Sequence, residues 1–233
     1  MLKHIPNALT LTRLILAPVI AWFYWLGASP WPPHVPGLGY DEAIAQYDYL
    51  TTTYLSLAAV LFVVAALTDL FDGMAARAFN AHSKFGRIID PIADKALVGL
   101  PLIAIVLSLW HARFLNFFYF PITLAVAVIV VRDVTMTWVR LAAPDGEGAR
   151  VSSLAKIKTA LELFVVGSFL VVAAIETHFL EAVAKMSSSV ELQQALRIDL
   201  PRALWIGWSL LLVITAALSA YTGWQYLRPT KKS

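Results

Sequence analysis

Four aspartates stand in two pairs, and each pair has the spacing of neighbours on one face of a helix. Asp69 and Asp72 are three residues apart, and Asp90 and Asp94 are four apart. Carboxylate oxygens are the ligands that hard divalent cations such as Mg²⁺ or Mn²⁺ prefer. Four carboxylates can hold two ions, and paired ions clamp the oxygens of a transferring phosphoryl group. The pattern therefore predicts a metal-dependent phosphoryl-transfer site.

Small residues and one arginine accompany these acids. Gly73, Ala76 and Gly86 leave the helix surface open to a bulky ligand, and Arg77 can offer a forked guanidinium to a diphosphate beside the metals. Taken alone, the glycines fit close helix packing equally well, and Arg77 fits an ordinary interfacial anchor. Beside four aspartates, we interpret them as parts of the ligand pocket.

A second group of charged residues lies later in the chain, within or next to apolar segments. Asp133 and Glu162 fall at membrane depth, where a carboxylate is costly unless it is paired. Lys156 and Lys158 are two residues apart and do not share a helix face, so at most one of them points into a cavity. A soluble acceptor with a dianionic phosphate needs a basic pocket, which these side chains would supply. The alternative is that the basic side chains extend to the membrane surface. The candidate pocket residues are Arg132, Arg140, Lys156 and Lys158.

The composition indicates that membrane-spanning helices carry these residues. The chain of 233 residues is 59% hydrophobic and 14% charged, against about 25% charged in soluble domains. A bilayer core of about 30 Å needs about 20 apolar residues per helix. The absence of cysteine excludes disulfides and thiolate metal sites. We expect one all-α integral membrane domain over residues 1–233, with no nucleic-acid partner and six spans at about 8–28, 52–76, 92–111, 117–141, 153–177 and 202–226.

The segments around these spans carry further predictions. The N-terminal segment lacks a small-residue cleavage site, so we interpret it as a retained span. Residues 78–88 form a turn that makes the second and third spans antiparallel neighbours, and 29–49 form a loop. Pro91 disfavours helical geometry at Asp90 and fits the first turn of the third span. The polar middle of 176–202 has the composition of a short surface helix.

The distribution of positive charge predicts orientation. Six spans put both termini on one side, together with the aspartates. That side then carries 14 of the 18 Lys and Arg residues, and the opposite side carries Arg113, Lys185, Arg197 and Arg202. Positive charge accumulates in cytoplasmic loops. We expect an inner-membrane, multi-pass protein with cytoplasmic termini and an active site on the cytoplasmic face.

The aspartate pattern closely resembles a known family signature. The run Asp69-x2-Asp72-Gly73-x2-Ala76-Arg77-x8-Gly86-x3-Asp90-x3-Asp94 is similar, without a gap or substitution, to that of the CDP-alcohol phosphotransferases. The resemblance implies that the four aspartates bind two divalent cations and that Asp94 is the general base. It implies that the acceptor hydroxyl attacks the β-phosphorus of a CDP-lipid and that CMP leaves. It also implies a nucleotide pocket made by Asp69, Gly73, Ala76, Arg77 and Gly86.

Two further stretches resemble one branch of this family. Residues 4–20 look like the opening of bacterial phosphatidylglycerophosphate synthases and related cardiolipin synthases, as does IDPIADKALVG at 89–99. This resemblance implies that Asn7 and Thr10 contact the CDP-lipid and that Arg13 contacts the acceptor. The alternative interpretation is that these residues form a capped helix start with an interfacial arginine. The Lys-Ile-Lys-Thr run at 156–159 favours CDP-diacylglycerol and glycerol 3-phosphate as substrates.

Other functions stay open at this point. The Arg132-Asp133 pair is more typical of eukaryotic-type cardiolipin synthases, which use phosphatidylglycerol as acceptor. The inositol-phosphate branch is a third option, and the family resemblance implies a possible homodimer. Intramembrane carboxylates also occur in cation transporters, but there they are spread along a path through the bilayer. Clustering at one depth beside Arg77 favours the enzyme.

Overall fold

A computed structural model of the chain describes residues 5–29, 39–79, 84–111, 119–142, 153–186 and 190–227. Within these ranges, side chains are described mainly for 9–29, 42–68, 89–110, 119–139, 156–179 and 204–226. The described residues form six α-helices and no strand. These are α1 (Ile5–Gly27), α2 (Tyr40–Phe79), α3 (Lys84–His111), α4 (Tyr119–Ala142), α5 (Ser153–Met186) and α6 (Val190–Leu227).

Each helix contains a segment long and apolar enough to cross a membrane. These segments are Leu9–Gly27, Glu42–Thr68, Ile89–Trp110, Tyr119–Val139, Lys156–Phe179 and Leu204–Tyr226. The predicted all-α class with six spans is therefore confirmed. The second span begins ten residues earlier than predicted, because α2 has 40 residues and is about 60 Å long at 1.5 Å per residue.

Four local predictions were wrong. Residues 78–79 and 84–88, predicted as part of a turn, belong to α2 and α3. Residues 40–49, predicted as loop, form the first turns of α2. The polar stretch between the last two spans forms no separate surface helix, because α5 continues to Met186 and α6 begins at Val190. Pro91 lies inside α3, which begins at Lys84, so Asp90 is helical. Membrane helices tolerate proline because neighbouring groups satisfy the freed carbonyl.

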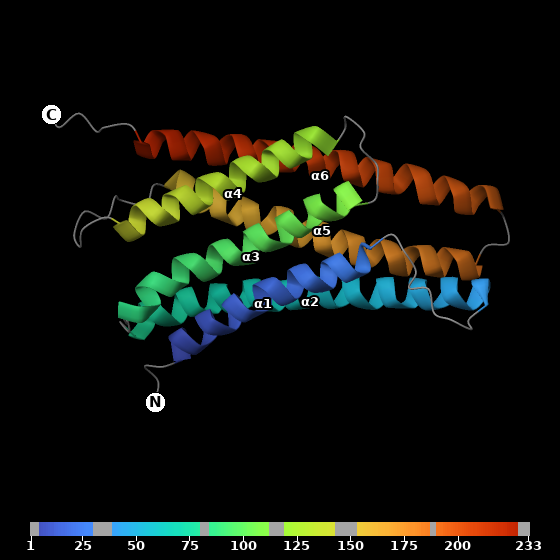
Figure 1. The fold of residues 1–233 in the computed structure, drawn as a ribbon, viewed down its shortest axis with the longest axis horizontal. Helices are drawn as coiled ribbons and strands as arrows, with labels where there is room; N and C mark the ends of the chain where they lie inside the picture. Colours follow the sequence, from blue (N-terminus) through green and yellow to red (C-terminus); the bar gives the residue numbers. More distant parts are fainter. Residues whose placement is uncertain are drawn as a thin grey trace.

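The helices form a bundle in which successive helices run in opposite directions (Figure 1). Helix α1 packs against α2 and α3, α5 packs against α2 and α6, and α4 packs against α6 and α3. The beginnings of α1, α3 and α5 and the ends of α2, α4 and α6 consequently lie together, at the left of Figure 1. We call this the motif end. It brings the start of α3, with Asp90 and Asp94, close to α1.

Small residues let the helices approach closely. A Cβ on Gly27 of α1 would lie 2.9 Å from Leu55 Cγ of α2, and one on Gly167 of α5 would lie 3.0 Å from Phe62 Cε1. Small side chains at crossings are the usual device for packing helices in membranes. These contacts join α1 and α5 to α2, and so set the frame on which α3 and α4 place their charged residues.

Candidate active site

Two acidic side chains stand one turn apart near the start of α3. Asp90 is exposed, and the side chain of Asp94 is 39% exposed. Their four-residue spacing puts both on one face of the helix. Both carboxylates are thus open to a ligand at the motif end.

Helix α1 contacts both carboxylates. Thr10 Oγ1 donates a hydrogen bond of 2.5 Å to Asp90 Oδ1, and Arg13 Nη1 donates one of 2.6 Å to Asp94 Oδ1. Thr10 and Arg13 are themselves buried and three residues apart, so one face of α1 meets one face of α3. The sequence led us to expect Thr10 at the CDP-lipid and Arg13 at the acceptor, and their contacts with the aspartates were not foreseen. Both residues hold the carboxylates in position.

The remaining motif residues are described only by their backbone. Asp69 and Asp72 lie in the last turns of α2, which reaches the motif end at Phe79. The meeting of all four carboxylates stays a prediction, because the side chains of Asp69 and Asp72 lie outside the described part. The predicted site residues whose side chains lie outside the described part are Asn7, Asp69, Asp72, Gly73, Ala76, Arg77, Gly86 and Arg140.

The described pair still fits a hard divalent cation. Each carboxylate has about four lone-pair sites, and the α1 contacts shown here engage Oδ1 of each. The exposure of Asp90 and of the Asp94 side chain leaves both accessible to a further ligand. The donor set consists of oxygen atoms, which suits Mg²⁺ or Mn²⁺.

A second charged cluster begins one residue after Asp94. Lys95 Nζ of α3 lies 2.7 Å from Asp133 Oδ2 of α4 and 3.6 Å from Glu162 Oε2 of α5. Lys158 Nζ contacts Asp133 Oδ1 and lies 2.6 Å from Glu162 Oε1. We call Lys95, Arg132, Asp133, Lys158 and Glu162 the charged cluster. The charged cluster joins α3, α4 and α5, although its members from different helices are far apart in the sequence.

Arg132 completes the charged cluster and connects it to α6. Its Nη1 lies 2.9 Å from Asp133 Oδ1, and its Nη2 donates a 3.2 Å hydrogen bond to Thr222 Oγ1. A Cβ on Gly223 would lie 3.1 Å from Arg132 Cγ, so the glycine makes room for the arginine stem. The guanidinium is thus held on two sides.

The charged cluster is deeply enclosed. It contains three cations and two carboxylates. The side chains of Lys158 and Glu162 are 0% exposed, whereas that of Lys95 is 21% exposed. Burying ions costs several kcal/mol each unless partners compensate. Lys95 is the most open of the cations in the charged cluster.

The two lysines of the Lys-Ile-Lys run behave differently. Lys158 is buried in the charged cluster, and Lys156 is exposed. Their two-residue spacing predicts this difference, but the sequence did not indicate which one is buried. Lys95, Thr222 and Gly223 were missed altogether. The signal that was available is the four-residue spacing of Lys158 and Glu162, which indicates an ion pair within one helix.

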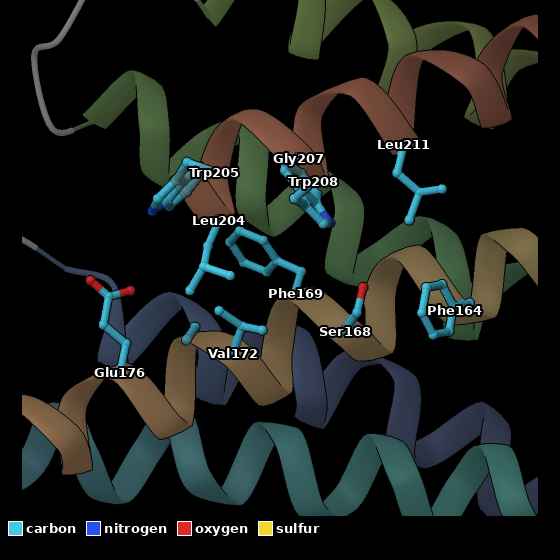
Figure 2. Close-up of a pocket in the computed structure, with 11 residues that line it drawn as sticks. Phe164, Ser168, Phe169, Val172, Glu176, Leu204, Trp205, Gly207, Trp208 and Leu211 are labelled. Carbon is cyan, nitrogen blue, oxygen red and sulfur yellow. The ribbon is translucent and has the colours of Figure 1, made fainter. Parts of the chain in front are cut away.

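A mostly apolar groove lined by described residues lies elsewhere. It has a volume of about 290 Å³ and runs between α5 and α6 (Figure 2). Phe169, Trp205 and Trp208 line it, and Trp208 Nε1 donates a 2.9 Å hydrogen bond to the Val165 carbonyl. Ser168 and Glu176 are the polar side chains among its described lining residues, and no predicted site residue with a described side chain lines it.

Comparison with known proteins agrees with the aspartate motif. A family model described as CDP-alcohol phosphatidyltransferase matches residues 3–188. A protein of Cereibacter sphaeroides named CDP-diacylglycerol--glycerol-3-phosphate 3-phosphatidyltransferase is 30% identical over 240 residues, covering 96% of this chain and 94% of its own. Proteins with the same name from Rickettsia typhi and Escherichia coli K12 are 32% and 29% identical. They match 70% and 84% of this chain, and 74% and 97% of their own length.

Proposed function

The chain belongs to the CDP-alcohol phosphatidyltransferase family, and we propose that it transfers the phosphatidyl group of CDP-diacylglycerol to glycerol 3-phosphate. The products are phosphatidylglycerophosphate and CMP. The names of the relatives support this choice of substrates. The observation that carries it is the succession of Asp94 and Lys95 on α3, because it joins an accessible carboxylate pair to a cationic cluster.

Asp94 acts as the general base in this proposal. It takes the proton of the acceptor hydroxyl, whose oxygen then forms a bond to the β-phosphorus of CDP-diacylglycerol. The bond from that phosphorus to the bridging oxygen breaks, and CMP leaves with that oxygen. Arg13 fixes the Asp94 carboxylate through Oδ1, and Thr10 fixes Asp90 in the same way. A base held in position loses less entropy in reaching the reacting hydroxyl.

Asp69, Asp72, Asp90 and Asp94 would hold a pair of divalent cations, either Mg²⁺ or Mn²⁺. When bound, these cations would neutralise negative charge on the pyrophosphate. The chain's own contribution is to present these carboxylates from α2 and α3, both of which pack against α1. We also propose that Gly73, Ala76, Arg77, Gly86 and Asn7 shape the pocket for the CDP head, and that Arg132 and Arg140 face the acceptor phosphate.

We further propose that the protein crosses the bacterial inner membrane with its motif end at the cytoplasm. Most of its basic residues belong to that end. The cysteine-free chain allows a direct test with single cysteines at the exposed residues Ala142 and Gly39, at opposite ends of the bundle. An impermeant maleimide added to intact cells should label only Gly39→Cys. Labelling of Ala142→Cys alone would invert the orientation.

The acceptor is tested by CMP release from CDP-diacylglycerol by purified protein with Mg²⁺. Glycerol 3-phosphate, phosphatidylglycerol and inositol phosphate are compared as acceptors. Glycerol 3-phosphate should support the fastest release, and faster release with phosphatidylglycerol would establish the cardiolipin synthase alternative. Asp94→Asn should lower kcat by about 10²- to 10⁴-fold, the usual contribution of a general base. Glu42→Gln, an exposed acid on α2, is the matched control. An Asp94→Asn variant as active as this control would remove Asp94 from the mechanism.

A further inference from the structure

Lys95 occupies the most open position of the charged cluster. Its side chain is 21% exposed, against 13% for Arg132 and 0% for Lys158. Its ammonium contacts Asp133 and approaches Glu162, so two carboxylates from α4 and α5 hold the tip of a flexible side chain. A lysine fixed in this way has lost the rotamer freedom that binding would otherwise cost.

The exposure of the cations in the charged cluster points to Lys95 as a contact for an anion. Among the described side chains the charged cluster contains the cations Lys95, Arg132 and Lys158. Lys158 is fully enclosed between Asp133 and Glu162, and so has no open face for a ligand. An ammonium carries three donors and a guanidinium five. Lys95 and Arg132, as the partly exposed cations, are therefore the members able to contact an anion from outside.

The position of Lys95 on α3 relates this anion to the reaction. Successive residues of an α-helix point about 100° apart. Asp94 meets Arg13 of α1, while Lys95 meets Asp133 of α4. The base and the ammonium thus occupy adjoining faces of one helix turn. An acceptor that carries a hydroxyl and a phosphate on a short carbon chain has one group for each of these two residues.

We propose that Lys95 contacts the phosphate of the acceptor and determines specificity for a phosphorylated alcohol, with Asp133, Glu162 and Lys158 as its positioning residues. The inference rests on the proposed function, and assigns to Lys95 a contact that the Lys-Ile-Lys run had suggested for Lys156 or Lys158. Lys158 serves as the buried counter-charge that keeps Asp133 and Glu162 in place.

Kinetics of Lys95→Gln test the contact. A charge-assisted hydrogen bond corresponds to about ten- to a hundred-fold in an equilibrium constant. We expect KM for glycerol 3-phosphate and the inhibition constant of inorganic phosphate to rise by that factor, with KM for CDP-diacylglycerol little changed. Lys95→Arg should restore most of both. Equal rises in the two KM values, or unchanged phosphate inhibition, would overturn the proposal.

Positioning through Lys95 predicts a non-additive pair of substitutions. Glu162→Gln should raise KM for glycerol 3-phosphate, and should add little when Lys95 is already Gln, because its effect passes through that lysine. Additive effects in the double variant would show that Glu162 acts independently of Lys95. Glu42→Gln again serves as the control for removal of an acid.

Labelling of wild-type protein gives a readout that needs neither activity nor a variant. A water-soluble amine-acylating reagent, with mass spectrometry, should modify Lys95 more slowly when inorganic phosphate is present. Modification of the exposed Lys156 should be insensitive to phosphate. Protection of Lys156 in place of Lys95 would refute the assignment. Wild-type protein that releases no CMP with glycerol 3-phosphate would instead refute the proposed function.

Discussion

Replacing Lys158 by Met removes the cation that two buried carboxylates share. Lys158 contacts Asp133 and lies 2.6 Å from Glu162, and both Lys158 and Glu162 have 0% exposed side chains. Removing one partner of a buried ion pair costs about 3–5 kcal/mol, because the other charge stays buried without compensation. Asp133 keeps Lys95 and Arg132 as partners, whereas Glu162 keeps only Lys95, at 3.6 Å, among the described residues. Most of the cost should therefore arise at Glu162.

The assay is the free energy of unfolding in detergent micelles, from denaturant titration. Lys158→Met should lower it by about 3–5 kcal/mol. Lys156→Met, two residues away and exposed, should change it by less than about 0.5 kcal/mol. Adding Glu162→Gln to Lys158→Met should recover stability, with a coupling energy of about 0.5–3 kcal/mol.

Two results would refute this reasoning. If Lys158→Met and Lys156→Met were equally stable, the burial of Lys158 would carry no energetic weight. If Glu162→Gln destabilised the Lys158→Met protein as much as it destabilises the wild type, the two residues would be uncoupled. Either outcome would mean that the charged cluster does not hold α3, α4 and α5 together as an ionic network.

Two other predictions concern contacts between helices. Arg13→Gln removes a charge-assisted bond to Asp94 worth about 1.5–3 kcal/mol. The kcat should therefore fall by about 10- to 100-fold, while the KM values for both substrates change little. A rise only in KM for the acceptor would contradict the role of Arg13 in positioning Asp94. Gly223→Ala puts a Cβ 3.1 Å from Arg132 Cγ, so KM for glycerol 3-phosphate should rise several-fold, whereas Gly207→Ala on the same helix meets nothing within 4 Å and should be neutral. Equal kinetics of the two alanine variants would show that Arg132 does not depend on the space at Gly223.

The hydropathy pattern was sufficient for the spans, but not for the ends of the helices. A run of apolar residues must cross the bilayer as a helix because no water is present to satisfy its backbone. Polar residues beyond that run carry no such constraint. The helical turns at 40–49 and the continuous end of α5 to Met186 were consequently missed. Pro91 misled for a different reason. The restriction on the residue before a proline is outweighed in a membrane helix, where neighbouring groups satisfy the freed carbonyl, and α3 is helical at Asp90.

The sequence by itself determined the chemistry of this protein, because the spacing of Asp90 and Asp94 along one helix and the residues around them are local properties of the chain. Only the tertiary structure decided which partners those residues have. Thr10 with Asp90 and Arg13 with Asp94 are 80 and 81 residues apart, and Lys95 reaches Asp133 and Glu162 across two helix interfaces. Ion pairs between helices depend on which faces pack together. Packing depends on the shape of the whole bundle, including close approaches such as Gly27 on Leu55, and no spacing rule within one helix contains that information.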